Sequence, residues 1–64
     1  MPRQARALDC GAGVGRVTQE LLIKHFDFID LIEPAKNFIE EAKVRCKNLK
    51  HQGNRVDKFY QSTL

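Results

Sequence analysis

Three glycines at alternate positions, with an acid before them and an arginine after them, form the stretch of this chain best suited to chemistry. The stretch covers residues 9–16 and reads DCGAGVGR. Glycines allow a tight backbone turn and let a ligand approach main-chain N–H groups, and a helix that follows presents further unpaired N–H groups. A short apolar strand, a glycine turn and a helix in this order predict a site for a nucleotide-type cofactor.

Three interpretations of the turn compete: a dinucleotide site, an S-adenosyl-L-methionine site, or a structural turn without a ligand. The dinucleotide fingerprint requires Gly-x-Gly-x-x-Gly or Ala, and Arg16 occupies the position that should be small. Asp9 would repel a pyrophosphate but would favour an ammonium or sulfonium group. The structural alternative for Asp9 is an acid that caps nearby N–H groups.

Two further charged residues fit a cofactor that carries a carboxylate and a ribose. Arg16 lies at the start of the predicted helix, where the helix dipole disfavours a cation by about 0.3–1 kcal/mol, and a ligand carboxylate would offset that cost. The alternative is an exposed, screened arginine. Glu33 ends the next predicted strand, ~20 residues beyond the glycines, where an acid accepts both ribose hydroxyls in such folds. The alternative is a strand-end acid before Pro34 with no partner.

The hydrophobic pattern predicts the elements that position these residues. From Val14 onward, apolar residues recur at the i, i+3, i+7 and i+8 spacing of a helix with one buried face, which would leave Thr18 on the outer side. Asn37 is expected to cap a second helix through a capping box with Glu40, and Gly53-Asn54 is expected to be a turn. Residues 1–4 are interpreted as an N-terminal segment that is not anchored to the fold. The expected strands are residues 6–9, 28–33 and 56–62, and the expected helices are residues 14–26 and 37–49.

This order of elements predicts an α/β fold, the βαβαβ half of a doubly wound, Rossmann-like parallel sheet. Because such crossovers are right-handed, both helices should lie on one face of the sheet, and the other face and the far edge of the first strand should be bare. Parallel sheets normally have both faces covered. We therefore interpret residues 1–64 as the N-terminal cofactor-binding half of a domain, which we do not expect to fold stably alone.

The composition of the chain indicates its cellular compartment and the kinds of molecule that it binds. Cys10 and Cys46 have the spacing of neither a disulfide framework nor a zinc site, which favours a reducing compartment, and we expect a cytoplasmic and nuclear protein with no metal. No apolar run is long enough to span a membrane. The net charge is +3, and basic residues gather in residues 43–58. Because no aromatic residues interleave with the charges of residues 43–55, we interpret this strip as a solvated face and expect no nucleic-acid partner.

Residues 9–16, with Glu33 closing the next strand, resemble motif I and its acidic follow-up in class I S-adenosylmethionine-dependent methyltransferases. The sequences ALDCGAGVGRVT at residues 7–18 and FIEEAK at residues 38–43 resemble one family within this class in particular, the protein α-N-terminal methyltransferases. Members of that family methylate the α-amine of proteins whose exposed N-terminus resembles X-Pro-Lys. The resemblance extends over residues 6–64 and implies S-adenosyl-L-methionine as cofactor and protein N-termini as partners.

The resemblance also implies a role for individual residues. Gly11 and Arg16 would contact the methionine part of the cofactor, Glu33 its ribose, and Leu64 would lie where the family begins to contact the adenine. Glu33 replaces the aspartate that is more usual in some relatives. Its longer side chain keeps the carboxylate and would shift the ribose.

Gly13 and Gly15 would supply the turn geometry of the same cofactor site. No catalytic residue is expected within the chain. An α-amine has a pKa of about 7.7–8.0, so methyl transfer needs a base or a site that binds the neutral amine. His25 and His51 are interpreted as surface residues, and Cys10 as a small buried residue.

These observations predict an enzyme that transfers a methyl group from S-adenosylmethionine to the α-amino group of protein N-termini. The 64-residue chain would supply the cofactor-binding half and would be inactive alone. Two alternatives remain: a half-domain of a nicotinamide-dependent oxidoreductase, and a non-enzymatic binding module that uses the basic strip.

Overall fold

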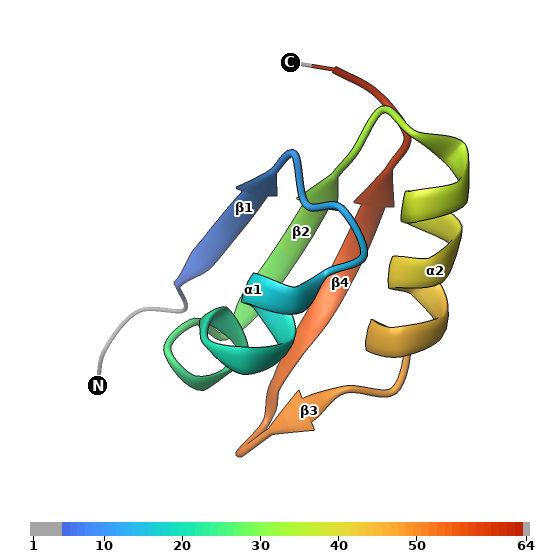
Figure 1. Cartoon of the computed structure of the whole chain (residues 1–64). Coiled ribbons are helices and arrows are strands. Elements are labelled where there is room, and N and C mark those ends of the chain that lie inside the picture. The colour runs from blue at the N-terminus through green and yellow to red at the C-terminus, as the bar shows by residue number, and fades with distance from the viewer. Residues whose placement is uncertain (1–4, 64) are drawn as a thin grey trace.

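A four-stranded sheet with two helices on one face makes up the computed structural model, which describes residues 5–63 (Figure 1). The predictions made for residues 1–4 and for Leu64 lie outside the described residues. In chain order the elements are β1 (Arg6–Cys10), α1 (Arg16–Glu20), the short 3-10 helix η1 (Leu22–Lys24), β2 (Phe28–Ile32), α2 (Lys36–Cys46), β3 (Lys50–His51) and β4 (Asn54–Tyr60).

The strands follow the order β1-β2-β4-β3 across the sheet. β1, β2 and β4 are parallel, which confirms the predicted α/β fold, and β3 pairs antiparallel with β4. β3 was not predicted from the sequence. It forms a hairpin with β4 because Gln52 and Gly53 both adopt positive φ, 52° and 91°, as a tight two-residue hairpin turn requires. The turn therefore lies one residue before the predicted Gly53-Asn54, and Asn54 already belongs to β4.

The first helix is much shorter than the predicted residues 14–26. Gly15 is its N-cap in the left-handed conformation, so α1 begins at Arg16. Leu21, with φ −129° and ψ −61°, ends it after five residues. The chain then tightens into η1, whose Ile23 enters the core. The carbonyl of Ile23 also accepts a hydrogen bond from the Asn54 side-chain amide at 2.9 Å, which ties this turn to β4.

The break in the first helix changes which of its side chains are buried. Val17 and Leu21, expected on the buried face, are 54% and 51% exposed. Thr18, expected on the outer side, is 0% exposed. The predicted apolar face assumed one continuous helix, and the change of backbone direction at Leu21 removes the register on which that face depended.

The second helix also begins differently from the prediction. Its N-cap is Ala35, whose side chain makes no capping hydrogen bond, and Asn37 lies inside the first turn. The predicted capping box is therefore wrong. The Glu33 carboxylate instead accepts a hydrogen bond from the Ala35 N–H at 2.9 Å. A side chain that follows β2 therefore satisfies a backbone N–H group at the start of α2. The helix ends at Cys46, three residues before the predicted Leu49.

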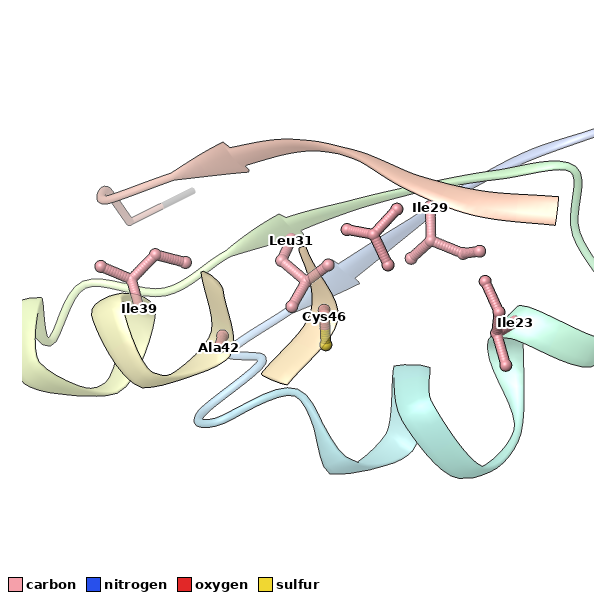
Figure 2. Packing of buried hydrophobic residues seen from close by; sticks show 7 residues of the cluster. Ile23, Ile29, Leu31, Ile39, Ala42 and Cys46 are labelled. Carbon is pink, nitrogen blue, oxygen red and sulfur yellow. The ribbon is translucent and has the colours of Figure 1, made fainter. Parts of the chain in front are cut away.

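The core lies between the sheet and the two helices, as the side chains in Figure 2 show. Because side chains alternate along a strand, Ile29 and Leu31 of β2 point toward the helices, and both are fully buried. The remaining core side chains come from η1, α2 and β4. They are Ile23, Ile39, Ala42, Cys46 and Val56.

The opposite face of the sheet carries no helix within residues 5–63, as predicted. Leu8 is 49% exposed on this face. Cys10 is exposed as well, so the interpretation of Cys10 as a buried residue was wrong. Within the described residues, β1 pairs only with β2, and its other edge is open.

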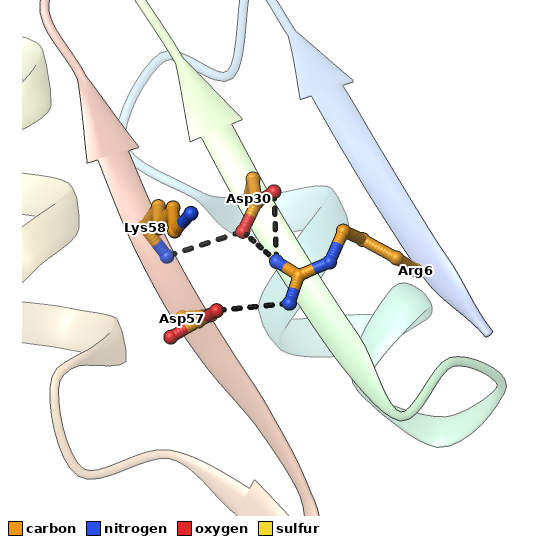
Figure 3. A network of polar contacts seen from close by, with 4 residues as sticks. All are labelled: Arg6, Asp30, Asp57 and Lys58. Carbon is orange, nitrogen blue, oxygen red and sulfur yellow. Dashed lines mark hydrogen bonds and ion pairs between the residues drawn. The ribbon is translucent and has the colours of Figure 1, made fainter. Parts of the chain in front are cut away.

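An ion-pair network crosses the bare face (Figure 3). Arg6 Nη1 donates to both oxygens of Asp30 at 2.7 and 2.9 Å, and Arg6 Nη2 lies 3.0 Å from Asp57 Oδ2. The hydrogen bonds to Asp30 and Asp57 raise the pKa of the Arg6 guanidinium. The register of β4 shifts opposite Asp30, and there the Lys58 N–H donates to Asp30 Oδ1 at 3.2 Å. The carboxylate thus holds three strands together.

Candidate cofactor site

The glycine turn joins β1 to α1 and lies beside the C-terminal end of β2 (Figure 1). The Ala12 N–H donates to the Ile32 carbonyl at 3.1 Å, which fixes the turn on that strand. Gly11, Gly13 and Gly15 have φ of 64°, 59° and 87°. All three lie in the left-handed region that side chains with a Cβ rarely adopt, so the backbone of the turn favours glycine at each of these positions.

The three glycines differ in what surrounds them. A Cβ added at Gly11 or Gly13 would meet no atom within 4 Å, whereas one at Gly15 would lie 2.9 Å from Cys46 Sγ. Gly11 and Gly13 therefore leave open space beside their backbone, where a ligand can approach. The absence of a Cβ at Gly15 allows α2 to pack against the turn. In the dinucleotide fingerprint the residue that permits this close packing is one position later, where this chain has Arg16.

Glu33 connects the turn to the start of α2. It is 7% exposed, and its Oε1 accepts the Gly13 N–H at 2.7 Å while its Oε2 accepts the Ala35 N–H at 2.9 Å. The alternative of an acid without a partner was therefore wrong. A carboxylate offers about four lone-pair positions, so two remain for the donors of a ligand. The same side chain can hold the turn and accept ligand hydroxyls.

Asp9 lies at the C-terminal end of β1, beneath the turn. Its Oδ2 accepts a hydrogen bond from the Thr18 hydroxyl at 2.8 Å. The structural alternative for Asp9 predicted that its carboxylate caps backbone N–H groups. Within residues 5–63 the carboxylate instead accepts the Thr18 hydroxyl. Thr18 was missed as a site residue because the helical pattern assigned it to the surface.

Cys46 packs against the underside of the turn and is fully buried. Burial raises the pKa of its thiol, Arg45 opposes this shift, and the charge of Asp9 adds to it. The thiol is therefore held in its neutral form beside the turn. It acts there as a small packing group rather than as a nucleophile.

Arg16 lies next to the turn, and its ion pair within residues 5–63 is weak. Its side chain is 74% exposed, and its Nε lies 3.9 Å from Glu20 Oε2, a weak contact for an exposed pair. Because α1 has only five residues, its dipole contributes little to the binding of an anion at its N-terminus. Arg16 itself is the cation that a ligand carboxylate could meet.

The structure brings together most of the predicted cofactor residues at one edge of the sheet. Asp9, Gly11, Gly13 and Glu33 lie at the C-terminal ends of adjacent parallel strands, β1 and β2, where ligands bind in open α/β sheets. Leu64 lies outside the described residues. A separate apolar groove of about 430 Å³ is elsewhere, between α2 and β4. It is lined by Lys43, Val44, Lys47 and Phe59.

Among residues 5–63, no three histidine, cysteine, aspartate or glutamate side chains gather as a metal site would require. In the same part of the chain, every helix is too short or too polar to cross a bilayer.

Comparison with known proteins identifies the family. The model of the AdoMet dependent proline di-methyltransferase family matches residues 1–64, and the chain belongs to this family. The resemblance drawn from residues 7–18 and 38–43 is thereby confirmed, and S-adenosylmethionine is the cofactor on which the family depends.

Individual relatives agree with this assignment. An alpha N-terminal protein methyltransferase 1 from Oryza sativa subsp. indica is 39% identical over 61 residues, covering 91% of this chain and 20% of the relative. The protein of the same name from Drosophila melanogaster is 40% identical over 64 residues, covering 100% of this chain and 23% of the relative. An N-terminal Xaa-Pro-Lys N-methyltransferase 1 from Bos taurus is 41% identical over 54 residues, with 84% and 23% covered.

A solved structure shares the fold. A SAM-dependent methyltransferase from Leishmania major is 44% identical, with a TM-score of 0.79 over 95% of this chain and 23% of that protein. The chain thus spans about a fifth of the length of the curated relatives it matches. The fold of the chain corresponds to part of a methyltransferase domain, and this part is a partial Rossmann-like sheet.

Proposed function

We propose that this chain binds S-adenosylmethionine at the glycine turn and supplies the cofactor-binding half of an enzyme that methylates the α-amino group of protein N-termini. The observation that carries the proposal is the Glu33 carboxylate, held by the Gly13 N–H at 2.7 Å beside two glycines whose Cβ positions face open space. Family membership across residues 1–64 supports the choice of cofactor.

Each proposed contact follows from the chemistry of the side chain. The free lone pairs of Glu33 accept the ribose hydroxyls, and the open backbone at Gly11 and Gly13 admits the methionine end. Arg16, exposed and weakly paired, binds the ligand carboxylate. Asp9 favours the ligand ammonium group because of its charge.

Leu64 is proposed to begin the adenine contact, on the resemblance alone. S-adenosylmethionine, when bound, would supply a methyl carbon attached to a positively charged sulfur; a neutral amine attacks that carbon, the carbon–sulfur bond breaks, and S-adenosylhomocysteine leaves. The residues of this chain bind and orient that group, and none is proposed as catalytic. The names of the relatives, which specify Xaa-Pro-Lys N-termini, support protein N-termini as the substrate class.

The test is a calorimetric titration of the purified chain with S-adenosylhomocysteine, the demethylated form of the cofactor. An Arg16→Ala, Glu33→Ala double variant serves as the comparison, and NADH as the competing ligand. Where the wild-type chain folds, alone or within a longer methyltransferase, we expect binding that the double variant loses and that NADH does not displace. Equal binding by the double variant would refute the assigned contacts, and displacement by NADH would favour the oxidoreductase alternative.

A chimera provides the missing context if the isolated chain does not bind. Residues 5–63 replace the matched segment of the Leishmania major methyltransferase, to which this chain is 44% identical. Binding and turnover on an Xaa-Pro-Lys peptide are then measured with the same variants. A folded chimera without affinity for S-adenosylhomocysteine would reject the proposed function.

A further inference from the structure

Thr18 is the most deeply buried polar side chain of the described residues. It is 0% exposed, and the other buried polar residues are Asp30 and Glu33. A buried hydroxyl must place its single donor hydrogen on an acceptor, since an unsatisfied one costs about 1–3 kcal/mol. The acceptor is Asp9 Oδ2, at 2.8 Å. The hydroxyl of Thr18 is therefore committed to one oxygen of a carboxylate in the candidate site.

The two residues come from elements that the fold fixes independently. Asp9 belongs to β1 and is in register with the fully buried Leu31 of β2, so strand pairing holds its backbone. Thr18 belongs to α1 and is fully buried. A β-branched side chain has few χ1 conformations available. The hydrogen bond between them therefore sets the orientation of the Asp9 carboxylate.

The orientation leaves one oxygen of Asp9 available. Within residues 5–63, the bond from Thr18 is the only hydrogen bond that this carboxylate accepts. Oδ1 receives no hydrogen bond from those residues. The Asp9 carboxylate lies at the end of β1, close to Gly11 and the open space beside that glycine. A carboxylate with one oxygen anchored and one free is arranged to receive a cationic group.

We propose that Thr18 is a positioning residue, which anchors Oδ2 of Asp9 so that Oδ1 meets the ammonium group at the methionine end of the ligand. The inference rests on the proposed function. Thr18 touches no part of the ligand itself and acts through Asp9. Without the hydroxyl, the carboxylate can rotate, and part of the interaction with the ammonium group is lost.

The test compares two ligands that differ only at the end in question. S-adenosylhomocysteine carries the ammonium group, and methylthioadenosine lacks the amino-acid end. Thr18→Val removes the hydroxyl and keeps the shape, whereas Thr18→Ser keeps the hydroxyl. We expect Thr18→Val to weaken the binding of S-adenosylhomocysteine about 10-fold, because the ligand ammonium group loses about one charge-assisted hydrogen bond to the misoriented Asp9 carboxylate. Methylthioadenosine should change less than about 2-fold, and Thr18→Ser should restore the affinity.

A double-mutant cycle with Asp9→Asn tests whether Thr18 acts through Asp9. If it does, Thr18→Val should add little to the effect of Asp9→Asn, because residues that share one interaction are not additive. Additive effects, or equal weakening of both ligands, would show that Thr18 serves packing only and would overturn the inference.

The failure of this inference and that of the proposed function give different results. Wild-type binding of S-adenosylhomocysteine with unchanged affinity in Thr18→Val overturns the inference alone. Absence of wild-type binding in both the chain and the Leishmania major chimera overturns the proposed function and the inference with it. Melting curves without ligand, recorded for every variant by circular dichroism, identify any variant whose affinity falls because it unfolds.

Discussion

Substitution of Gly15 by alanine tests how tightly α2 closes on the glycine turn. The new Cβ would lie 2.9 Å from Cys46 Sγ, with Leu31 Cδ2 and Ala42 Cβ at 3.4 and 3.6 Å. Cys46 is fully buried, so its sulfur can move only by displacing its neighbours. Overpacking of this kind costs about 1–3 kcal/mol. The left-handed backbone at φ 87° adds about 1–2 kcal/mol for a residue with a Cβ, and we expect a total of about 2–5 kcal/mol.

The matched control is Gly11→Ala. Gly11 has a similar left-handed φ of 64°, and its Cβ would meet no atom within 4 Å. Only the backbone contribution of about 1–2 kcal/mol should appear there. The difference between the two variants isolates the contact with α2.

The assay is denaturant unfolding followed by circular dichroism. A trimethylamine N-oxide background keeps the folded baseline visible, because the osmolyte strengthens effective burial and a chain of this size has a small margin of stability. In a Cys46→Ala background the cost of Gly15→Ala should fall to that of Gly11→Ala. Equal costs for Gly15→Ala and Gly11→Ala in the wild-type background, or no relief by Cys46→Ala, would refute the close packing of turn and helix.

Glu33, Cys46 and the hairpin turn at Gln52 each contribute to stability in a way that can be measured. Glu33→Gln should destabilise the chain by about 1–3 kcal/mol, measured by the same unfolding assay, because glutamine offers one acceptor to the two N–H groups that Glu33 now satisfies. Burial raises the pKa of Cys46 above its ordinary value of 9.0. The folded state therefore keeps the thiol proton that the unfolded state loses. Stability from this group is complete below pH 9.0 and should fall above it, by at most about 1.4 kcal/mol per pH unit, as unfolding curves at stepped pH would show. Gln52→Asn should raise the melting temperature, with a gain of about 0.5–1 kcal/mol, because asparagine tolerates the positive φ of this hairpin turn.

Each of these predictions has a control and a contrary outcome. Glu40→Gln changes an exposed acid of α2 and should leave stability nearly unchanged, and an equal loss at both positions would contradict the role of Glu33. Cys46→Ala should lack the decline specific to the thiol, and an unaltered pH profile would show that other groups cause it. A lower melting temperature for Gln52→Asn would mean that the glutamine side chain, and not the turn conformation, stabilises the hairpin.

The sequence by itself determined the order of the main elements and the place of the turn. Alternate glycines permit φ values near 60° whatever the surroundings, and the apolar run before Glu33 forms a strand wherever a sheet can bury it. These properties are local, so they can be derived from neighbouring residues. The sequence assigned the glycine turn and Glu33 to one cofactor site, and they lie together because parallel strands end at the same edge of a sheet.

Only the tertiary structure decided which side chains of the first helix are buried. The pattern of Val17 and Leu21 predicted one continuous amphipathic helix, but burial of Ile23 requires the chain to tighten after α1. Thr18 then faces Asp9. The gain from packing Ile23 depends on residues of β2 and β4 far along the chain, and no local spacing encodes it.

Tertiary contacts likewise selected β3 and the register shift in β4. Lys50 and His51 are polar and have no strand pattern of their own, and they become a strand because the turn at Gln52 and Gly53 folds them against β4. The Lys58 N–H bonds the Asp30 carboxylate, which Arg6 holds in place. Pairings of this kind join residues that are distant in sequence, so the energy that fixes them arises only when the sheet is assembled.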